Sequence, residues 1–128
     1  MLKLVALGGG HGLAATLTSL RSVTEDITAI VTVADDGGSS GRLRRDFGVI
    51  PPGDLRMALA ALCADDDWGN AWAQAIQYRF PGDEGVGGHA LGNLMLTALW
   101  KSTGDVVLSL EQMGNLLKVK GQIGRAHV

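Results

Sequence analysis

The fold of this chain follows from one stretch near its start, Leu4-Val5-Ala6-Leu7-Gly8-Gly9-Gly10-His11-Gly12-Leu13. Residues 2–7 form a short run, apolar except for Lys3, that ends at three glycines, which is the pattern of a buried strand. Residues 13–20 then carry leucines at helical spacing. A strand, a glycine turn and a helix in this order predict the first half of a βαβ unit.

A second strand completes that unit. Residues 27–33 are rich in β-branched side chains and are predicted to be extended. Two strands joined through a helix should be parallel, with a right-handed crossover. Apolar residues at helical spacing predict further helices over residues 55–63, 68–76, 91–99 and 106–117. Asp54, the run at 65–67 and Asp105 are placed to cap three of them.

The strand content is low for an α/β domain. Only two strands are visible, about a tenth of the chain, whereas roughly 20–25% is usual. We therefore expect an α/β, Rossmann-like parallel sheet with flanking helices, truncated so that only the first two strands and the following helices are present. Residues 1–121 would be the amino-terminal part of a single nucleotide-binding domain. We expect such an isolated fragment to be poorly soluble or molten, and to bind ligand weakly.

The last residues do not suit a further buried strand, because Gly124, Arg125 and His127 interrupt it. Residues 123–128 resemble a translated sequencing-adapter read. We therefore expect residues 122–128 to be a non-native tail.

Composition narrows the class of protein. The formal net charge is -2, which gives no general attraction to nucleic acid. The single cysteine, Cys63, allows neither an internal disulfide nor a cysteine-based metal cage. No stretch approaches the roughly 20 apolar residues of a membrane span. These features predict a cytoplasmic protein without nucleic-acid partners or membrane insertion.

The glycine turn is the first candidate binding element. Gly8, Gly9, Gly10 and Gly12 surround His11 at the junction of strand and helix. Such a turn lets backbone amides approach a phosphate at a helix N-terminus. The dinucleotide fingerprint G-x-G-x-x-G is incomplete, because Leu13 takes its third glycine position. A plain tight turn is the alternative, and His11 could be a neutral hydrogen-bonding group or a simple loop residue.

The second candidate element follows the second strand and covers residues 34–42. Asp35 stands where an acidic side chain could accept hydrogen bonds from ribose hydroxyls. Asp35 and Asp36 together could hold Mg²⁺, the candidate cofactor. Residues 37–41, including Ser39 and Ser40, are predicted to form a loop of exposed amides and hydroxyls. The alternative is a solvated acidic turn.

Two further groups of polar residues are candidates. Arg56 follows the rigid turn Pro51-Pro52-Gly53-Asp54 and could pair with a phosphate. Arg44 and Arg45 fit a solvated helix face. His89 and Asn93 are four residues apart and share one face of an apolar helix. Their partner could be a ligand or the backbone carbonyls of a loop.

These motifs together resemble the gluconeogenesis factor family (YvcK type) within the 2-phospho-L-lactate transferase superfamily. The resemblance runs from Val5 to about Lys120 and is most specific over residues 32–43. It implies a Rossmann-like fold in a bacterial cytoplasmic protein that binds a UDP-sugar such as UDP-N-acetylglucosamine. The implied role is regulatory, in cell morphogenesis during gluconeogenic growth, rather than catalytic.

The matching positions imply which residues line the nucleotide site: Gly8, Gly9, Gly10, His11, Gly12, Asp35, Asp36, Ser39, Ser40, Asp54, Arg56, His89 and Asn93. The family's chains are more than twice as long as this one. The alternative is an enzyme related to the transferase, which moves a phospholactyl group from an activated guanosine diphosphate donor with Mg²⁺ beside its aspartates. An NAD-dependent dehydrogenase is disfavoured by the missing third glycine.

Overall fold

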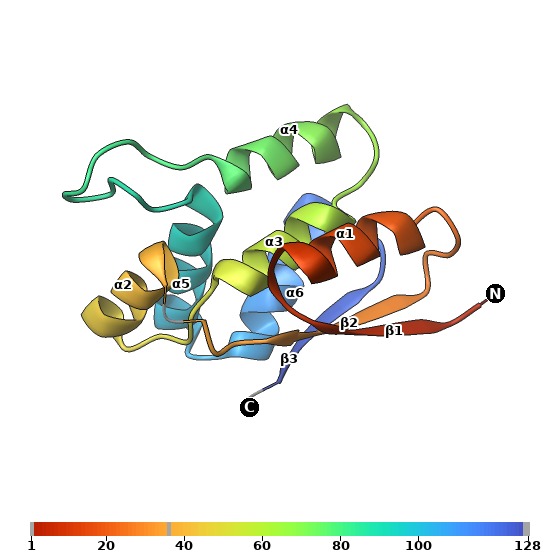
Figure 1. The fold of residues 1–128 in the computed structure, drawn as a ribbon, viewed down its shortest axis with the longest axis horizontal. Coiled ribbons are helices and arrows are strands. Elements are labelled where there is room, and N and C mark those ends of the chain that lie inside the picture. Colours follow the sequence, from red (N-terminus) through yellow and green to blue (C-terminus); the bar gives the residue numbers. More distant parts are fainter. Residues whose placement is uncertain (1, 36, 127–128) are drawn as a thin grey trace.

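A parallel sheet of three strands forms one side of the molecule (Figure 1). The computed structural model describes residues 2–35 and 37–126. The strand order is β1 (Leu4–Gly8), β2 (Ile27–Thr32) and β3 (Gln122–Ala126), with β2 in the centre. The βαβ unit predicted from the sequence is confirmed by the parallel pairing of β1 and β2, in which Ala6 lies opposite Ala29.

The prediction of only two strands was wrong, because residues 122–126 pair in parallel with β2. Ile123 lies opposite Ala29, and its half-buried side chain packs against the hydrophobic core. A glycine and an arginine are tolerated because β3 is an edge strand with little to bury. The pairing does not test where this tail comes from. His127 and Val128 lie outside the described residues.

The described part of the chain contains six helices. Their bounds are α1 (Gly10–Leu20), α2 (Gly38–Phe47), α3 (Gly53–Leu62), α4 (Asp67–Gln77), α5 (Leu91–Thr103) and α6 (Val106–Leu117). The predicted caps Asp66 and Asp105 are confirmed, since each carboxylate accepts from a backbone N–H in the first turn of α4 and α6. No helix in the described ranges is long and apolar enough to cross a membrane.

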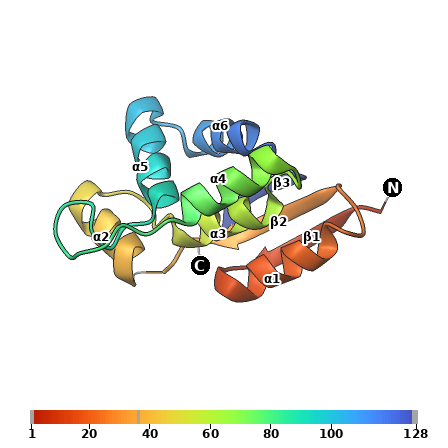
Figure 2. The ribbon, with the colours of Figure 1, turned by 90° about the horizontal axis from the view of Figure 1, so that it is seen from above.

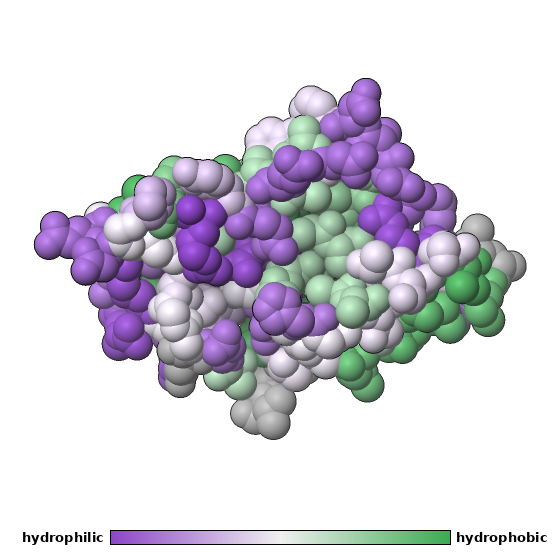
Figure 3. Space-filling model, turned by 45° about the horizontal axis from the view of Figure 1, so that its top comes forward, coloured by the Kyte–Doolittle hydropathy of each residue, from purple (hydrophilic) through white to green (hydrophobic). Residues whose placement is uncertain are grey.

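The core lies between the sheet and α1, α3 and α6. α1 packs on β1, α3 on β2 and α6 on β3, so these helices share one face of the sheet (Figure 2). Ile27, Ala29 and Val31 of β2 are fully buried beneath α3. On the opposite face, Val5 and Leu7 are 64% and 74% exposed. Figure 3 shows apolar surface gathered on the side of the molecule that carries β1.

Two predicted local features differ from the structure. Residues 38–41 are not a loop but the first turn of α2, in which Ser39 and Ser40 are buried. The N-cap residue of α3 is Pro52 and not Asp54. Asp54 lies within the first turn of α3, and its side chain does not cap that helix. In both cases a contact to a distant segment decides the conformation.

Candidate functional site

A polar cavity of about 300 Å³ opens at the carboxyl edge of the sheet. It lies where three helices begin. Its lining includes His11 of α1, residues 38–40 of α2, and Gly53, Asp54, Arg56 and Met57 of α3. Each helix N-terminus carries a partial positive charge and unpaired backbone amides. Asp35 and Asn93 also line the cavity, as does Arg79, which follows α4. The edge of the sheet predicted to bind ligand is therefore hollow and polar.

The hydroxyl groups of Ser39 and Ser40 make buried contacts that position the N-terminus of α2. Ser40 Oγ accepts a hydrogen bond from the Gly53 backbone N–H at 2.8 Å, which joins the starts of α2 and α3. Ser39 Oγ lies 2.6 Å from His89 Nδ1 and accepts from Asn93 Nδ2 at 3.0 Å. Ser39 therefore positions α2 against α5, and its hydroxyl is already engaged within the protein.

The contacts of Ser39 belong to a longer chain of hydrogen bonds behind the cavity. Arg56 donates from Nε to Gln77 Oε1 at 2.6 Å and from Nη1 to Asn93 Oδ1 at 2.9 Å. Because the arginine can only donate, it fixes the orientation of the Asn93 amide. Asn93 then donates to Ser39. The Ser39 hydroxyl can in turn donate to His89 Nδ1, which is the arrangement for a neutral His89 with its proton on Nε2.

The surroundings of His89 favour this neutral form. Burial lowers the pKa of the imidazole, and the nearby Arg42 and Arg79 cations lower it further, whereas Asp46 acts in the opposite direction. The side chain is 4% exposed. His89 does not line the cavity, so the structure places it one contact behind the site.

We expect the free energy of unfolding to fall as the pH is lowered through about 6.5. The unfolded chain takes up a proton on His89 at a pH where the folded chain does not, so full stability is present above that value and is lost below it. Urea unfolding between about pH 5 and pH 8 measures this slope. His89→Gln should flatten it, and His11→Gln controls for the loss of a histidine. An unchanged slope in His89→Gln would contradict the assignment.

Opposite charges line different parts of the cavity. The carboxyl groups of Asp54 and Asp35 lie near each other. Burial raises the pKa of Asp54, and the negative charge of Asp35 raises it further. Burial and the neighbouring Arg79 cation lower the pKa of Arg56. The hydrogen-bond acceptors of Arg56 are the neutral amides of Gln77 and Asn93. The charge of Asp54 acts on the pKa of Arg56 in the opposite direction, but the pKa remains lowered. Two cations beside one polar cavity suit an anionic ligand.

The structure brings together most of the residues predicted from the sequence. Seven of them line the cavity: His11, Asp35, Ser39, Ser40, Asp54, Arg56 and Asn93. The glycines of the first turn lie beside it rather than in its lining, and Gly10 has a positive φ of 64° that favours glycine. Arg79 was missed. Its only sequence signal is a cation shortly before the Gly87-Gly88-His89 motif, and Arg79 in fact donates to the Gly88 carbonyl at 2.7 Å.

The predicted magnesium site remains a prediction. Within residues 2–35 and 37–126, no group of three or more His, Cys, Asp or Glu side chains could hold a metal ion. Asp36 lies outside those residues. Asp35 Oδ1 accepts from the Gly37 backbone N–H at 2.9 Å, a local turn contact.

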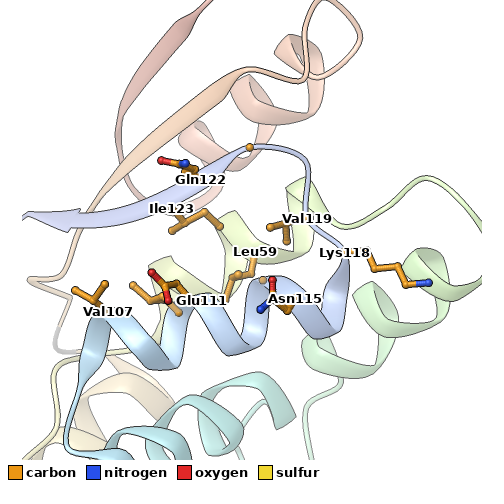
Figure 4. Close-up of a pocket in the computed structure, with 11 residues that line it drawn as sticks. Leu59, Val107, Glu111, Asn115, Lys118, Val119, Gln122 and Ile123 are labelled. Atoms are coloured by element: carbon orange, nitrogen blue, oxygen red, sulfur yellow. The ribbon is translucent and has the colours of Figure 1, made fainter.

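A larger groove of about 680 Å³ lies on the other side of α3, between α6 and β3 (Figure 4). Leu59, Val107 and Ile123 contribute apolar walls, and Glu111, Asn115 and Gln122 add scattered polar groups. In contrast to the smaller cavity, its lining includes no arginine. The groove runs beside the open edge of β3. Its size alone does not make it the better functional candidate.

Comparison with known proteins places the chain among relatives of one kind. The family model for 2-phospho-L-lactate transferase CofD matches residues 4–125. The gluconeogenesis factor of Bacillus subtilis is 46% identical over 121 residues, which cover 94% of this chain and 37% of the relative. A Mycobacterium leprae relative, which carries that name provisionally, is 57% identical over 94% of this chain and 34% of its own length.

A crystal structure of a Bacillus halodurans protein matches the fold with a TM-score of 0.88 and 43% sequence identity. The match covers 97% of this chain and 39% of that protein. The chain thus spans a little over a third of the length of its relatives. The match of nearly the whole chain to one family model confirms the resemblance seen in the motifs, and the chain belongs to the 2-phospho-L-lactate transferase CofD family.

Proposed function

We propose that the cavity at the start of α1, α2 and α3 is part of a nucleotide-sugar site in a regulator of the gluconeogenesis factor type. A UDP-sugar such as UDP-N-acetylglucosamine is the proposed ligand, and control of cell morphogenesis during gluconeogenic growth is the proposed role. The observation that carries this proposal is that Arg56 and Arg79 both line the cavity, together with the first residues of α2. A diphosphate would relieve the repulsion between the two guanidinium groups.

A transferase is the second candidate. Its support is the pair of carboxyl groups on Asp35 and Asp54, since related transfer chemistry uses aspartates with Mg²⁺. The regulatory function is favoured because the engaged hydroxyls of Ser39 and Ser40 hold helices together rather than face the cavity as free reacting groups. The cytoplasm is the proposed location for either function.

Calorimetric titration with UDP-N-acetylglucosamine, guanosine diphosphate and NAD side by side tests this proposal. The isolated chain is expected to bind weakly, so the titration is repeated on a graft. In the graft, residues 1–120 replace the matching part of the Bacillus subtilis gluconeogenesis factor. We expect the UDP-sugar to bind at least about tenfold more tightly than NAD.

A pair of arginine variants locates the site. Arg79→Ala should weaken UDP-sugar binding about tenfold, because one charge-assisted contact to phosphate is lost. Arg45→Ala, an exposed residue of α2 that does not line the cavity, is the matched control. The proposal would be contradicted if NAD bound most tightly of the three ligands, or if Arg79→Ala and Arg45→Ala weakened UDP-sugar binding equally.

A further inference from the structure

The side chain of Asp54 lies at the N-terminus of a helix other than its own. Asp54 belongs to the first turn of α3, yet its carboxylate lies against the glycine turn at the start of α1, where a Cβ on Gly10 would be 3.8 Å from Asp54 Oδ1. The approach is close, since a Cβ on Gly9 would lie 2.7 Å from Asp54 Oδ2 and 2.5 Å from Thr32 Oγ1. Gly9, the N-cap of α1, has no side chain of its own for this purpose. Asp54 therefore places a carboxylate beside the N-terminus of α1.

This contact changes what the glycine turn can bind. A helix N-terminus is ordinarily a favourable place for a phosphate. Here the carboxylate of Asp54 already lies beside Gly9 and Gly10, and Asp35 adds a second negative charge nearby. Like charges at short range repel, so a phosphate at this position would be disfavoured. Hydroxyl groups, which donate hydrogen bonds to carboxylates, would be accommodated.

The side chain of Arg56 extends from α3 in a different direction from the side chain of Asp54. Residues two apart on a helix do not face each other. Accordingly, Asp54 contacts the turn before α1, whereas Arg56 reaches Gln77 of α4 and Asn93 of α5. Arg79 lies near Arg56, as its effect on the pKa of that guanidinium shows. The cavity therefore has a carboxylate end at α1 and a cationic end at α4 and α5.

We propose that Asp54 determines the orientation of the ligand by accepting hydrogen bonds from its hydroxyls and keeping phosphate away from α1. The phosphates lie at the other end, between Arg56, Arg79 and the N-terminus of α2. This inference rests on the proposed function, because it concerns the same cavity and a ligand with both phosphates and sugar hydroxyls. It reverses the arrangement in which the glycine turn cradles the phosphates.

The experiment uses Asp54→Asn, which keeps the shape of the side chain and removes its charge, in the chain itself and in the graft. Asp65→Asn, an exposed loop residue outside the cavity lining, is the matched control. The probes are UDP-N-acetylglucosamine and inorganic pyrophosphate. We expect Asp54→Asn to weaken UDP-sugar binding about tenfold, because a charge-assisted hydrogen bond becomes a neutral one. Pyrophosphate affinity should stay within about threefold, since its site is elsewhere.

Backbone amide shifts in an NMR titration with pyrophosphate provide the second measurement. The amides of Ser39 and Ser40 should move, and those of residues 9–11 should not. Three results would overturn the inference: pyrophosphate-induced shifts at residues 9–11 in the unsubstituted protein, a loss of pyrophosphate binding on both Asp54→Asn substitution and removal of divalent cations, or unchanged UDP-sugar affinity in Asp54→Asn. Pyrophosphate binding at α2 without any UDP-sugar binding would instead refute the proposed function and leave the exclusion of phosphate from α1 standing.

Discussion

Replacing Asn93 with alanine is expected to lower the free energy of unfolding by about 3 kcal/mol or more. The side chain is 1% exposed and joins Arg56 to Ser39. Its removal would leave a buried guanidinium N–H and a buried hydroxyl without these partners. A buried donor that loses its acceptor bears the full desolvation penalty, which is larger when the donor is charged.

Urea unfolding of Asn93→Ala and of Asn70→Ala measures this effect. Asn70 is exposed on α4 and controls for the loss of an asparagine from a helix. Asn93→Asp separates the two contacts, because it keeps an acceptor for Arg56 but loses the donor to Ser39. A loss below about 1 kcal/mol in Asn93→Ala would show that the chain of hydrogen bonds is not a stabilising element.

Replacing Gly121 with alanine is expected to lower the free energy of unfolding by more than about 2 kcal/mol. Gly121 precedes β3 and has a φ of 98°, a backbone angle that residues other than glycine rarely adopt. A Cβ there would lie 2.3 Å from the Ile27 carbonyl oxygen. That oxygen belongs to the backbone of the central strand and cannot move without breaking the pairing of β2. We therefore expect β3 to detach.

Gly124→Ala is the control for this prediction, because its Cβ would meet nothing within 4 Å. We expect it to change the free energy of unfolding by no more than about 0.5 kcal/mol. Amide hydrogen exchange of residues 122–126 shows whether β3 has detached in Gly121→Ala. If both variants behave alike, β3 does not contribute to stability through its pairing with β2.

Membership of the family and the start of the fold could be read from short stretches of sequence. The glycine turn after β1, the strand at β2 and the caps Asp66 and Asp105 all depend on residues within a few positions of one another. Such features are set by local backbone preferences and by side chains one helical turn apart. The same locality explains why most of the cavity residues were identified, because they follow directly after strands or begin helices.

The tertiary structure decided how those residues are used. Ser39 meets His89 and Asn93 across separations of 50 and 54 residues, which turns an expected loop into the first turn of α2. The carboxylate of Asp54 lies beside the glycine turn before α1 and does not cap α3. Residues 122–126 become a strand because β2 offers them an open edge. A burial partner that lies far away in the sequence leaves no local pattern. Local preference therefore determined the first two strands and most of the helices, and long-range packing decided the start of α2, the third strand and the direction of the polar side chains.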